Sequence, residues 1–516
     1  MSIGSKPSAV CRGLVLDGVE GQLVTVEAQD TFDVEQGRTK ICGLPDASVR
    51  EGALRMRLAT RPFVGDAIFK FAGGVLLNLA PADVRKAGRT LDLALAMAYA
   101  GFLLDVDRPR LRRLLFLGEI ALDGEVRATP GVLAAAIEAR RHGLGLVLPA
   151  DALAEAALID GPPLYPVRYA FEAFDVVLGG RKPADVPRGA DAVEALAGGP
   201  LAKAPELAEV QGQYLARRAL ELAAAGGHNL LFEGPPGSGK TMLARRLPGI
   251  LPPLDDAAAL EAALVLSSRR EVDLRRFRIP PFRSPHHTAS AVGLAGGGSP
   301  IRPGEISLAH RGVLFLDELP EFSREALEVL REPMEERRVH VTRAGRTRSM
   351  PADCLVVAAM NPCPCGFAGA GDGRCRCPPQ TVRRYVSRLS GPLLDRFDLR
   401  VRLKPVPAGQ LIDAAPGEGS ASVRERVVAA RRCQAARGLL NAELDEAGLH
   451  RFAALDVAER GLYRRLTERH DLSARGAKRM LRVARTLADL AGSETITALH
   501  LSEAASFRLG TAGESA

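Results

Sequence analysis

Positions 234–241 of the chain read Gly234-Pro235-Pro236-Gly237-Ser238-Gly239-Lys240-Thr241, directly after the apolar run 229–233 and directly before the helical stretch 242–247. A glycine-rich loop between a strand and a helix is typical of a phosphate-binding P-loop. The glycines let backbone N–H groups close around phosphates, and the helix N-terminus adds a favourable partial charge. We expect Lys240 to reach the β- and γ-phosphates of ATP and the Thr241 hydroxyl to bind Mg²⁺. The agreement of eight positions and both flanks argues against a Gly-Pro turn without a ligand.

Two later apolar runs also end in polar side chains. Residues 312–318 (GVLFLDE) predict a buried strand that presents Asp317 and Glu318 at its carboxyl end. Asp317 suits the shell of Mg²⁺, and Glu318 suits activation of the water that attacks the γ-phosphate. Residues 355–361 (LVVAAMN) predict a neighbouring strand, and Asn361 is expected to position the same water.

The stretch 390–398 (SGPLLDRFD) follows these strands. In this order the P-loop, the Asp-Glu strand, the polar strand end and LLDRFD resemble the AAA+ ATPases. The resemblance implies that Arg396 acts in trans on the ATP of a neighbouring subunit, which contributes about 10³–10⁵ in rate in comparable enzymes. It also implies a ring of subunits, because the site is then incomplete in one chain.

A basic helix is predicted near the C-terminus, with Ser473 as its cap. Its cations recur every three or four residues and therefore share a face: Arg475, Lys478, Arg479, Arg482 and Arg485. For most of them a solvated basic face is the favoured explanation. The resemblance to the AAA+ ATPases implies that Arg475 is the second sensor, an arginine of the helical lid that touches the γ-phosphate.

Five further stretches narrow the resemblance. They are CGLPD (42–46), NLAPAD (78–83), GEIALDG (118–124), PFRSPHHTAS (281–290) and RPGEISLAH (302–310). With the motor motifs they resemble the ComM/YifB family of Mg-chelatase-like AAA+ ATPases over nearly the whole chain. The resemblance implies a homohexameric, ATP-driven DNA helicase that migrates branched DNA while single strands are recombined during natural transformation. The implied partners are single-stranded and branched DNA, further copies of the chain, and recombinase-associated proteins.

The chain of 516 residues is expected to be an α/β protein of three domains and a linker. These are an N-terminal α/β domain (1–185), a linker rich in Gly, Pro and Ala (186–207), the AAA+ P-loop core (208–403) and a C-terminal helical lid domain (404–516). In the first domain, strands are predicted at 23–28, 73–80 and 145–150, and helices at 47–59, 92–100 and 131–141.

This N-terminal domain resembles the proteolytic domain of Lon, which uses a Ser/Lys dyad. When it is aligned on 86–88 and 118–119, the serine position falls at Thr90 and the lysine position falls at Leu133. An aliphatic side chain cannot act as the base that activates a nucleophile. We therefore expect a Lon-like fold without peptidase activity.

Composition excludes several classes of protein. The chain is 47% hydrophobic and 25% charged, the profile of a soluble globular protein rather than a disordered or fibrous one. No apolar run reaches the roughly 18 residues that span a bilayer, and the N-terminus lacks a secretory pattern. A cytoplasmic protein with no membrane partner is expected. The net charge of +8 is concentrated, because residues 337–403 alone hold 13 basic and 4 acidic residues.

Part of this positive charge lies in residues 337–348 (RRVHVTRAGRTR), whose alternation predicts a β-hairpin. The stretch has no acid and five arginines: Arg337, Arg338, Arg343, Arg346 and Arg348. In related ring motors a hairpin at this place projects into the pore, where arginines bind DNA phosphates in a salt-dependent way without reading sequence. A solvated hairpin face is the alternative.

Four of the eight cysteines lie close together, as Cys363, Cys365, Cys375 and Cys377. In a reducing compartment such a cluster indicates a metal site or free thiols. Four thiolates satisfy a tetrahedral structural Zn²⁺, but the Cys-x-Cys spacing is less standard than Cys-x-x-Cys. A zinc site and free thiols therefore both remain as interpretations. The pair His286-His287 precedes the glycine-rich stretch 295–299, a candidate second pore loop; hydrogen bonding is more typical of such a pair than metal binding.

Three functions follow, in order of preference. The first is the ATP-driven DNA motor for branch migration in homologous recombination. The second is the ATPase subunit of a magnesium chelatase, which inserts Mg²⁺ into a porphyrin and shares the motor motifs. The third is a Lon-like ATP-dependent protease, which the leucine at position 133 argues against.

Overall fold

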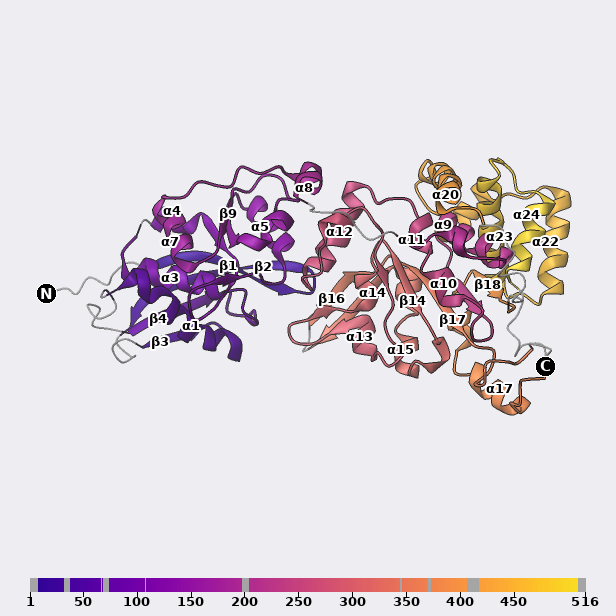
Figure 1. The fold of residues 1–516 in the computed structure, drawn as a ribbon, viewed down its shortest axis with the longest axis horizontal. Helices are drawn as coiled ribbons and strands as arrows, with labels where there is room; N and C mark the ends of the chain where they lie inside the picture. Colours follow the sequence, from indigo (N-terminus) through magenta and orange to yellow (C-terminus); the bar gives the residue numbers. More distant parts are fainter. Residues whose placement is uncertain are drawn as a thin grey trace.

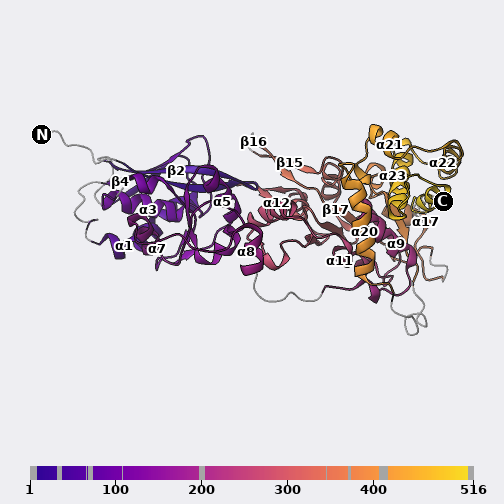
Figure 2. The same ribbon diagram turned by 90° about the horizontal axis from the view of Figure 1, so that it is seen from above.

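The computed structural model describes residues 8–31, 38–65, 67, 74–106, 108–196, 204–343, 346–369, 373–405 and 417–508. Figures 1 and 2 show an elongated molecule with an N-terminal α/β part at one end, a central α/β part, and C-terminal helices at the other end. No helix among the described residues is long and apolar enough to cross a membrane.

The N-terminal part is built on a mixed sheet of seven strands in the order β3-β4-β2-β1-β5-β8-β9. Its strands are β1 (Ala9–Asp17), β2 (Glu20–Thr31), β3 (Thr39–Cys42), β4 (Gly74–Ala80), β5 (Leu114–Phe116), β8 (Gly145–Pro149) and β9 (Leu164–Val167). Strands β1, β2 and β4 pair antiparallel, whereas β1, β5, β8 and β9 are parallel neighbours. The strands predicted at 23–28, 73–80 and 145–150 are confirmed as parts of β2, β4 and β8.

Helices cover both faces of this sheet and make two separate cores. On one face α1 (Ala47–Val64), α3 (Asp92–Leu103) and α7 (Ala170–Leu178) pack on the strands. On the other face the core contains α5 (Val132–Arg141) and α6 (Leu153–Ala156). Asp46 caps α1 by accepting a 2.9 Å hydrogen bond from the backbone N–H of Val49. The three predicted helices agree with α1, α3 and α5.

The central part contains an all-parallel sheet of five strands in the order β11-β14-β17-β10-β18. These are β10 (Leu230–Glu233), β11 (Phe282–Arg283), β14 (Val313–Leu316), β17 (Leu355–Met360) and β18 (Leu399–Arg402). Strands β10, β14 and β17 are buried along their whole length, as expected for a parallel sheet covered on both faces. Successive residues alternate between the two cores, so that Leu230 faces one and Leu231 the other.

The C-terminal part is helical throughout its described residues. Its elements are α20 (Ser420–Ala435), α21 (Glu446–Phe452), α22 (Val457–Arg469), α23 (Ala474–Leu490) and α24 (Ala498–Ser506), with a short 3-10 turn between α20 and α21. Helix α20 packs along α9 (Tyr214–Gly226) and α11 (Leu247–Ile250) of the central part (Figure 2). The apolar faces of these helices join the core on one side of the parallel sheet.

The N-terminal part contacts the central part through α12 (Asp256–Ser267). Ser267 accepts hydrogen bonds from the backbone N–H groups that begin α5, 2.9 Å from Gly131 to its carbonyl and 3.1 Å from Leu133 to its hydroxyl. The turn between β1 and β2 also reaches the central part, because the N–H of Gly18 donates to the carbonyl of Ile301 at 3.1 Å.

Part of the predicted linker is folded. Residues Gly189–Leu196 form helix α8, and its Ala192 is fully buried in the same core as Ala263 of α12. The stretch 186–207 has few large apolar residues, so its composition did not predict a helix; in the structure Val193 and Leu196 of α8 pack on this core beside Ala192.

Candidate functional site

The P-loop follows β10 at the carboxyl edge of the parallel sheet and leads into α10 (Lys240–Ala244). Gly237 and Gly239 have φ values of +75° and +91°, which side chains other than glycine rarely adopt. A Cβ atom added at either position would meet no atom within 4 Å, so the loop lies open on the side where phosphates would bind. The two glycines are therefore required by backbone conformation and not by crowding.

The Lys240 ammonium folds back over the loop. Its Nζ donates to the carbonyl oxygens of Gly234 and Pro235 at 2.6 and 2.9 Å, and to Oδ1 of Asn361 at 3.1 Å. Burial lowers the pKa of Lys240 from its ordinary value, although Asp317 and Glu318 oppose the shift. Within the described part of the chain the amine has no direct carboxylate partner, and it can turn its hydrogen bonds towards a phosphate.

The same edge of the sheet gathers the oxygen ligands that Mg²⁺ prefers. Asp317 follows β14, and its Oδ2 accepts a 2.6 Å hydrogen bond from the Thr241 hydroxyl. The Ser238 hydroxyl within the P-loop is buried and has no hydrogen-bond partner among the residues that the structure describes. An orphaned donor, an ammonium without a carboxylate and a hydroxyl–carboxylate pair together fit a nucleotide phosphate with Mg²⁺.

Glu318 has an unforeseen partner. Its carboxylate Oε2 lies 3.0 Å from Nδ1 of His287, in a pair that is partly exposed on both sides. The neighbouring ring of His286 contacts the His287 ring in a tilted arrangement with centroids 4.1 Å apart, and its Nδ1 bonds to the Thr288 hydroxyl. The sequence analysis singled out the pair His286-His287. No sequence pattern predicted that His287 would contact Glu318, the carboxylate expected to activate water.

Arg396 lies at the opposite, amino-terminal edge of the sheet, just before β18. Its side chain is only 8% exposed, and Nη2 contacts Oε2 of Glu335 at 2.7 Å. Its Nε and Nη1 donate to the carbonyl oxygens of Arg331 and Pro392 at 3.1 and 2.6 Å. In the single chain this arginine is fully bonded and remote from its own P-loop.

Arg475 lies on the same edge as Arg396. It is exposed at the start of α23 and lines a cavity of about 340 Å³ together with Asn229, Glu335 and Asp398. No P-loop residue lines this cavity. The structure therefore brings Arg475 to the neighbourhood of Arg396 and not to the phosphate loop of its own chain.

Buried charges fix α23 at this edge. Asp398 is 2% exposed and accepts a 2.6 Å hydrogen bond from Arg479, while His228 Nδ1 lies 3.5 Å away. Burial alone would raise the pKa of Asp398, but Arg479 and His228 outweigh it and hold the pKa well below its usual range. The helix is thus anchored to the strand edge that carries Arg396.

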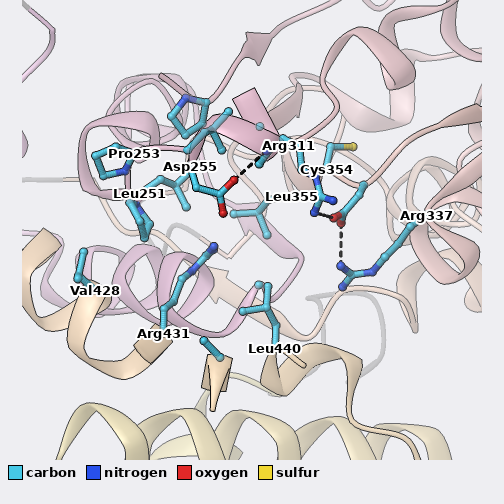
Figure 3. A pocket seen from close by; sticks show the side chains of 18 of the residues that line it. Leu251, Pro253, Asp255, Arg311, Arg337, Cys354, Leu355, Val428, Arg431 and Leu440 are labelled. Carbon is cyan, nitrogen blue, oxygen red and sulfur yellow. Dashed lines mark hydrogen bonds and ion pairs between the residues drawn. The ribbon is translucent and has the colours of Figure 1, made fainter. Parts of the chain in front are cut away.

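A second cavity of about 380 Å³ also lies at the amino-terminal edge, between the central part and α20 (Figure 3). Asp353 bridges Arg311 and Arg337 there, with both contacts at 2.7 Å, and Arg337 also pairs with Glu443 of the helical part. Figure 3 shows Arg431 projecting from α20 into the space between Leu251 and Leu440. The cavity is separate from the phosphate loop, and Arg337 belongs to it.

The family descriptions "Magnesium chelatase, subunit ChlI", "Magnesium chelatase, subunit ChlI C-terminal" and "Subunit ChlI of Mg-chelatase" match residues 206–411, 417–508 and 29–152, respectively. The protein YifB of Escherichia coli, described as uncharacterized, is 42% identical over 495 residues, 95% of each chain. Competence protein ComM of Haemophilus influenzae is 40% identical over 499 residues, again 95% of each chain.

The chain belongs to the ComM/YifB family of magnesium-chelatase-like proteins. A shorter stretch of 106 residues, 20% of the chain, is 32% identical to an uncharacterized MCM-type protein of Methanocaldococcus jannaschii. Membership of this AAA+ family supports ATPase activity with ATP and Mg²⁺, and the parallel sheet is consistent with an AAA+ core.

The hairpin predicted in this ComM/YifB-family chain is present as β15 (Arg338–Arg343) and β16 (Arg346–Pro351). Its Val339 and Val341 side chains are buried, whereas Arg338 and Arg343 are exposed. The side chain of Arg346 lies outside the described part of the structure.

Two of the five arginines predicted to contact DNA instead form ion pairs with other parts of the chain. Arg337 ends α16 (Pro333–Glu336) and joins the Asp353 cavity described above. Arg348 contacts Asp17 of the N-terminal part through Nη2 at 2.6 Å. Ion pairs with residues distant in sequence thus remove Arg337 and Arg348 from the exposed face of the hairpin.

The two residues at the positions aligned with a peptidase dyad are buried. The Thr90 hydroxyl is nearly buried and donates a 2.7 Å hydrogen bond to the carbonyl oxygen of Leu14. Leu133 is fully buried in the core beneath α5. Neither side chain lies in an accessible site.

Proposed function

We propose that this chain is the subunit of a ring-forming, ATP-driven DNA motor that migrates branched DNA in homologous recombination during natural transformation. The observation that carries the proposal is the division of the catalytic groups between two edges of one sheet. The phosphate loop occupies the carboxyl edge, while Arg396 and Arg475 occupy the amino edge. A complete site then needs the carboxyl edge of one subunit and the amino edge of the next, which a closed ring supplies to every subunit.

At the carboxyl edge each side chain has a separate task. Lys240 binds the terminal phosphates, and Thr241 with Asp317 holds the Mg²⁺ that offsets their charge. Glu318 orients the attacking water and accepts its proton, and Asn361 lies near enough to Lys240 to position that water. These assignments follow from where the strands end.

At the amino edge Arg396 exchanges Glu335 for the γ-phosphate of the neighbouring subunit. Arg475 lines a cavity together with Glu335 and is already exposed, so it can approach the same phosphate. Both cations stabilise charge that develops on the transferred phosphoryl group. The helical part that carries Arg475 therefore acts as the lid of the adjacent site.

DNA is the proposed partner of the hairpin. Arg338 and Arg343 are exposed on it, and Arg346 is in the facing strand. Gly297, of the glycine-rich stretch, lies beside Arg343, since a Cβ on Gly297 would be 3.9 Å from Nε of Arg343. Two adjacent loops, one of them arginine-rich, form a surface suited to phosphates of single-stranded and branched DNA.

The test is ATP hydrolysis and strand exchange on forked and four-way DNA, with Lys240→Ala as control. DNA should stimulate hydrolysis by the wild type, and branches should move only with ATP and an intact Lys240. Glu318→Gln should bind ATP and assemble but hydrolyse slowly. The motor proposal would be refuted if DNA did not stimulate ATP hydrolysis and if no branch migration occurred.

Two alternatives are tested in the same preparation. The matching families are named after a chelatase subunit, and such a subunit would support ATP-dependent insertion of Mg²⁺ into a porphyrin when chelatase partner subunits are supplied. A Lon-like N-terminal fold is proposed without peptidase activity, so peptide hydrolysis that disappears in Thr90→Ala would contradict that part of the proposal.

A further inference from the structure

Four cysteine side chains converge directly after β17. Cys363 and Cys365 come from the turn that follows this strand, and Cys375 and Cys377 come from the segment before α17 (Pro379–Val386). Their four Sγ atoms all lie within 4.8 Å of one another. Cys363 is fully buried and the other three are partly buried.

The spacing of the sulfur atoms is that of a tetrahedral site. Distances of 3.2, 3.9 and 3.7 Å separate Cys363 from Cys365, Cys363 from Cys375, and Cys365 from Cys375. A zinc ion bound by four thiolates at about 2.3 Å places neighbouring sulfur atoms about 3.8 Å apart. A disulfide would require about 2.05 Å, which none of these pairs approaches.

The surroundings of the cluster also suit a metal. The N–H of Ala368 donates to Sγ of Cys363 at 3.3 Å, and the N–H of Gly366 closes a tight turn on the Cys363 carbonyl at 2.9 Å. Arg374 and Arg376 alternate with the last two cysteines in sequence, so two positive charges offset the net charge of a metal with four thiolates. An amide aimed at a sulfur atom is the support that ligating groups receive in metal sites.

The turn Cys363–Gly369 also touches the P-loop. A Cβ atom on Gly366, whose φ is +86°, would lie 2.5 Å from Cδ and 2.7 Å from Cγ of Pro236. Asn361, which bonds to Lys240, precedes the first cysteine by two residues. The conformation of the turn thus affects the phosphate loop through the direct contact of Gly366 with the ring of Pro236.

We propose that Cys363, Cys365, Cys375 and Cys377 bind one structural Zn²⁺, and that the turn it fixes supports the P-loop through the contact of Gly366 with Pro236. The donor set selects the ion, because thiolates in a tetrahedral arrangement favour zinc over Mg²⁺ and Ca²⁺. The site is separate from the catalytic Mg²⁺, and its existence does not depend on DNA.

Metal content of the purified full chain tests the first half. We expect about one zinc per chain in wild type and in Cys433→Ser, which removes an exposed cysteine elsewhere, but little zinc in Cys375→Ser. Replacement by Co²⁺ in the wild type should give the absorption bands of a tetrahedral thiolate complex, which tests the site without a mutation. Protein without metal, or with one iron in place of zinc, overturns the assignment.

ATP binding tests the second half, with two glycines as a matched pair. Gly366 and Gly369 both have positive φ, but only Gly366 faces Pro236, and a Cβ on Gly369 meets nothing within 4 Å. Gly366→Ala should weaken ATP binding about tenfold more than Gly369→Ala, because it forces the turn off the loop. Equal ATP affinities in the two variants would overturn the claim that the turn supports the P-loop. Lys240→Ala should keep its zinc, which separates failure of this inference from failure of the motor.

Discussion

His287 provides a direct test of how hydrolysis is restrained in the chain before DNA is bound. Its Nδ1 lies 3.0 Å from the carboxylate of Glu318, the group proposed to accept a proton from water. A carboxylate engaged with an imidazole is not free to orient water. Because His287 lies in a loop whose chain continues into the glycine-rich turn near Arg343, DNA bound there can draw it away from Glu318.

The size of the effect follows from the exposure of the pair. The two side chains are 32% and 51% exposed, so solvent screens the interaction and it contributes at most about 1 kcal/mol. Release of Glu318 by His287→Ala should therefore raise the ATPase rate without DNA by up to about fivefold. The rate with saturating DNA should stay close to wild type, because the pair is already broken in that state.

The assay is steady-state phosphate release at saturating ATP, with and without single-stranded DNA. His286→Ala is the matched control, because the His286 ring contacts His287 but bonds to Thr288 and not to Glu318. A lower rate without DNA in His287→Ala would show that the histidine positions Glu318 for catalysis, and would refute the restraint argued here.

Three other predictions concern the ring, the hairpin and the docked helix. A 1:1 mixture of Lys240→Ala and Arg396→Ala subunits should recover about a quarter of wild-type turnover if sites are shared between neighbours, although each variant alone is inactive. Arg343→Ala should weaken DNA binding and reduce the salt slope by about 1, whereas Arg348→Ala should leave that slope unchanged in a fluorescence titration. Asp398→Ala should lower the free energy of unfolding by about 3–5 kcal/mol in chemical denaturation, since it leaves a buried cation unpaired. The depressed pKa of Asp398 means that its contribution is fully present above about pH 4 and is lost as pH falls towards that pKa.

The residues at the carboxyl edge of the parallel sheet could be predicted because each is identified by a short segment of sequence around it. Lys240, Asp317 and Asn361 each follow a short apolar strand, and parallel strands bring their carboxyl ends to one edge whatever the rest of the chain does. The hairpin was equally local, because alternation along two short segments specifies both strands.

What the sequence did not reveal depends on contacts between distant segments. Arg348 reads as one of five similar arginines until the fold places it against Asp17, 331 positions earlier in the chain. No sequence pattern distinguishes Glu335 from other acidic residues, yet it is the carboxylate that pairs with Arg396. The opposite-edge position of Arg475 likewise depends on where α23 docks, which is set by the buried pair of Asp398 and Arg479.

The pairing of Arg396 in the single chain is compatible with a role in trans because its exchange is energetically easy. Glu335 is 46% exposed, so water can take over its hydrogen bonds when the pair opens. A pair with one solvated partner contributes at most about 1 kcal/mol, whereas charge-assisted bonds from a guanidinium to a phosphate are roughly twice as strong as neutral ones. The two backbone carbonyls that also hold Arg396 keep its side chain directed along the amino edge after Glu335 is released. A free subunit therefore protects its arginine from solvent, and only a neighbour that presents phosphate at that edge completes the site.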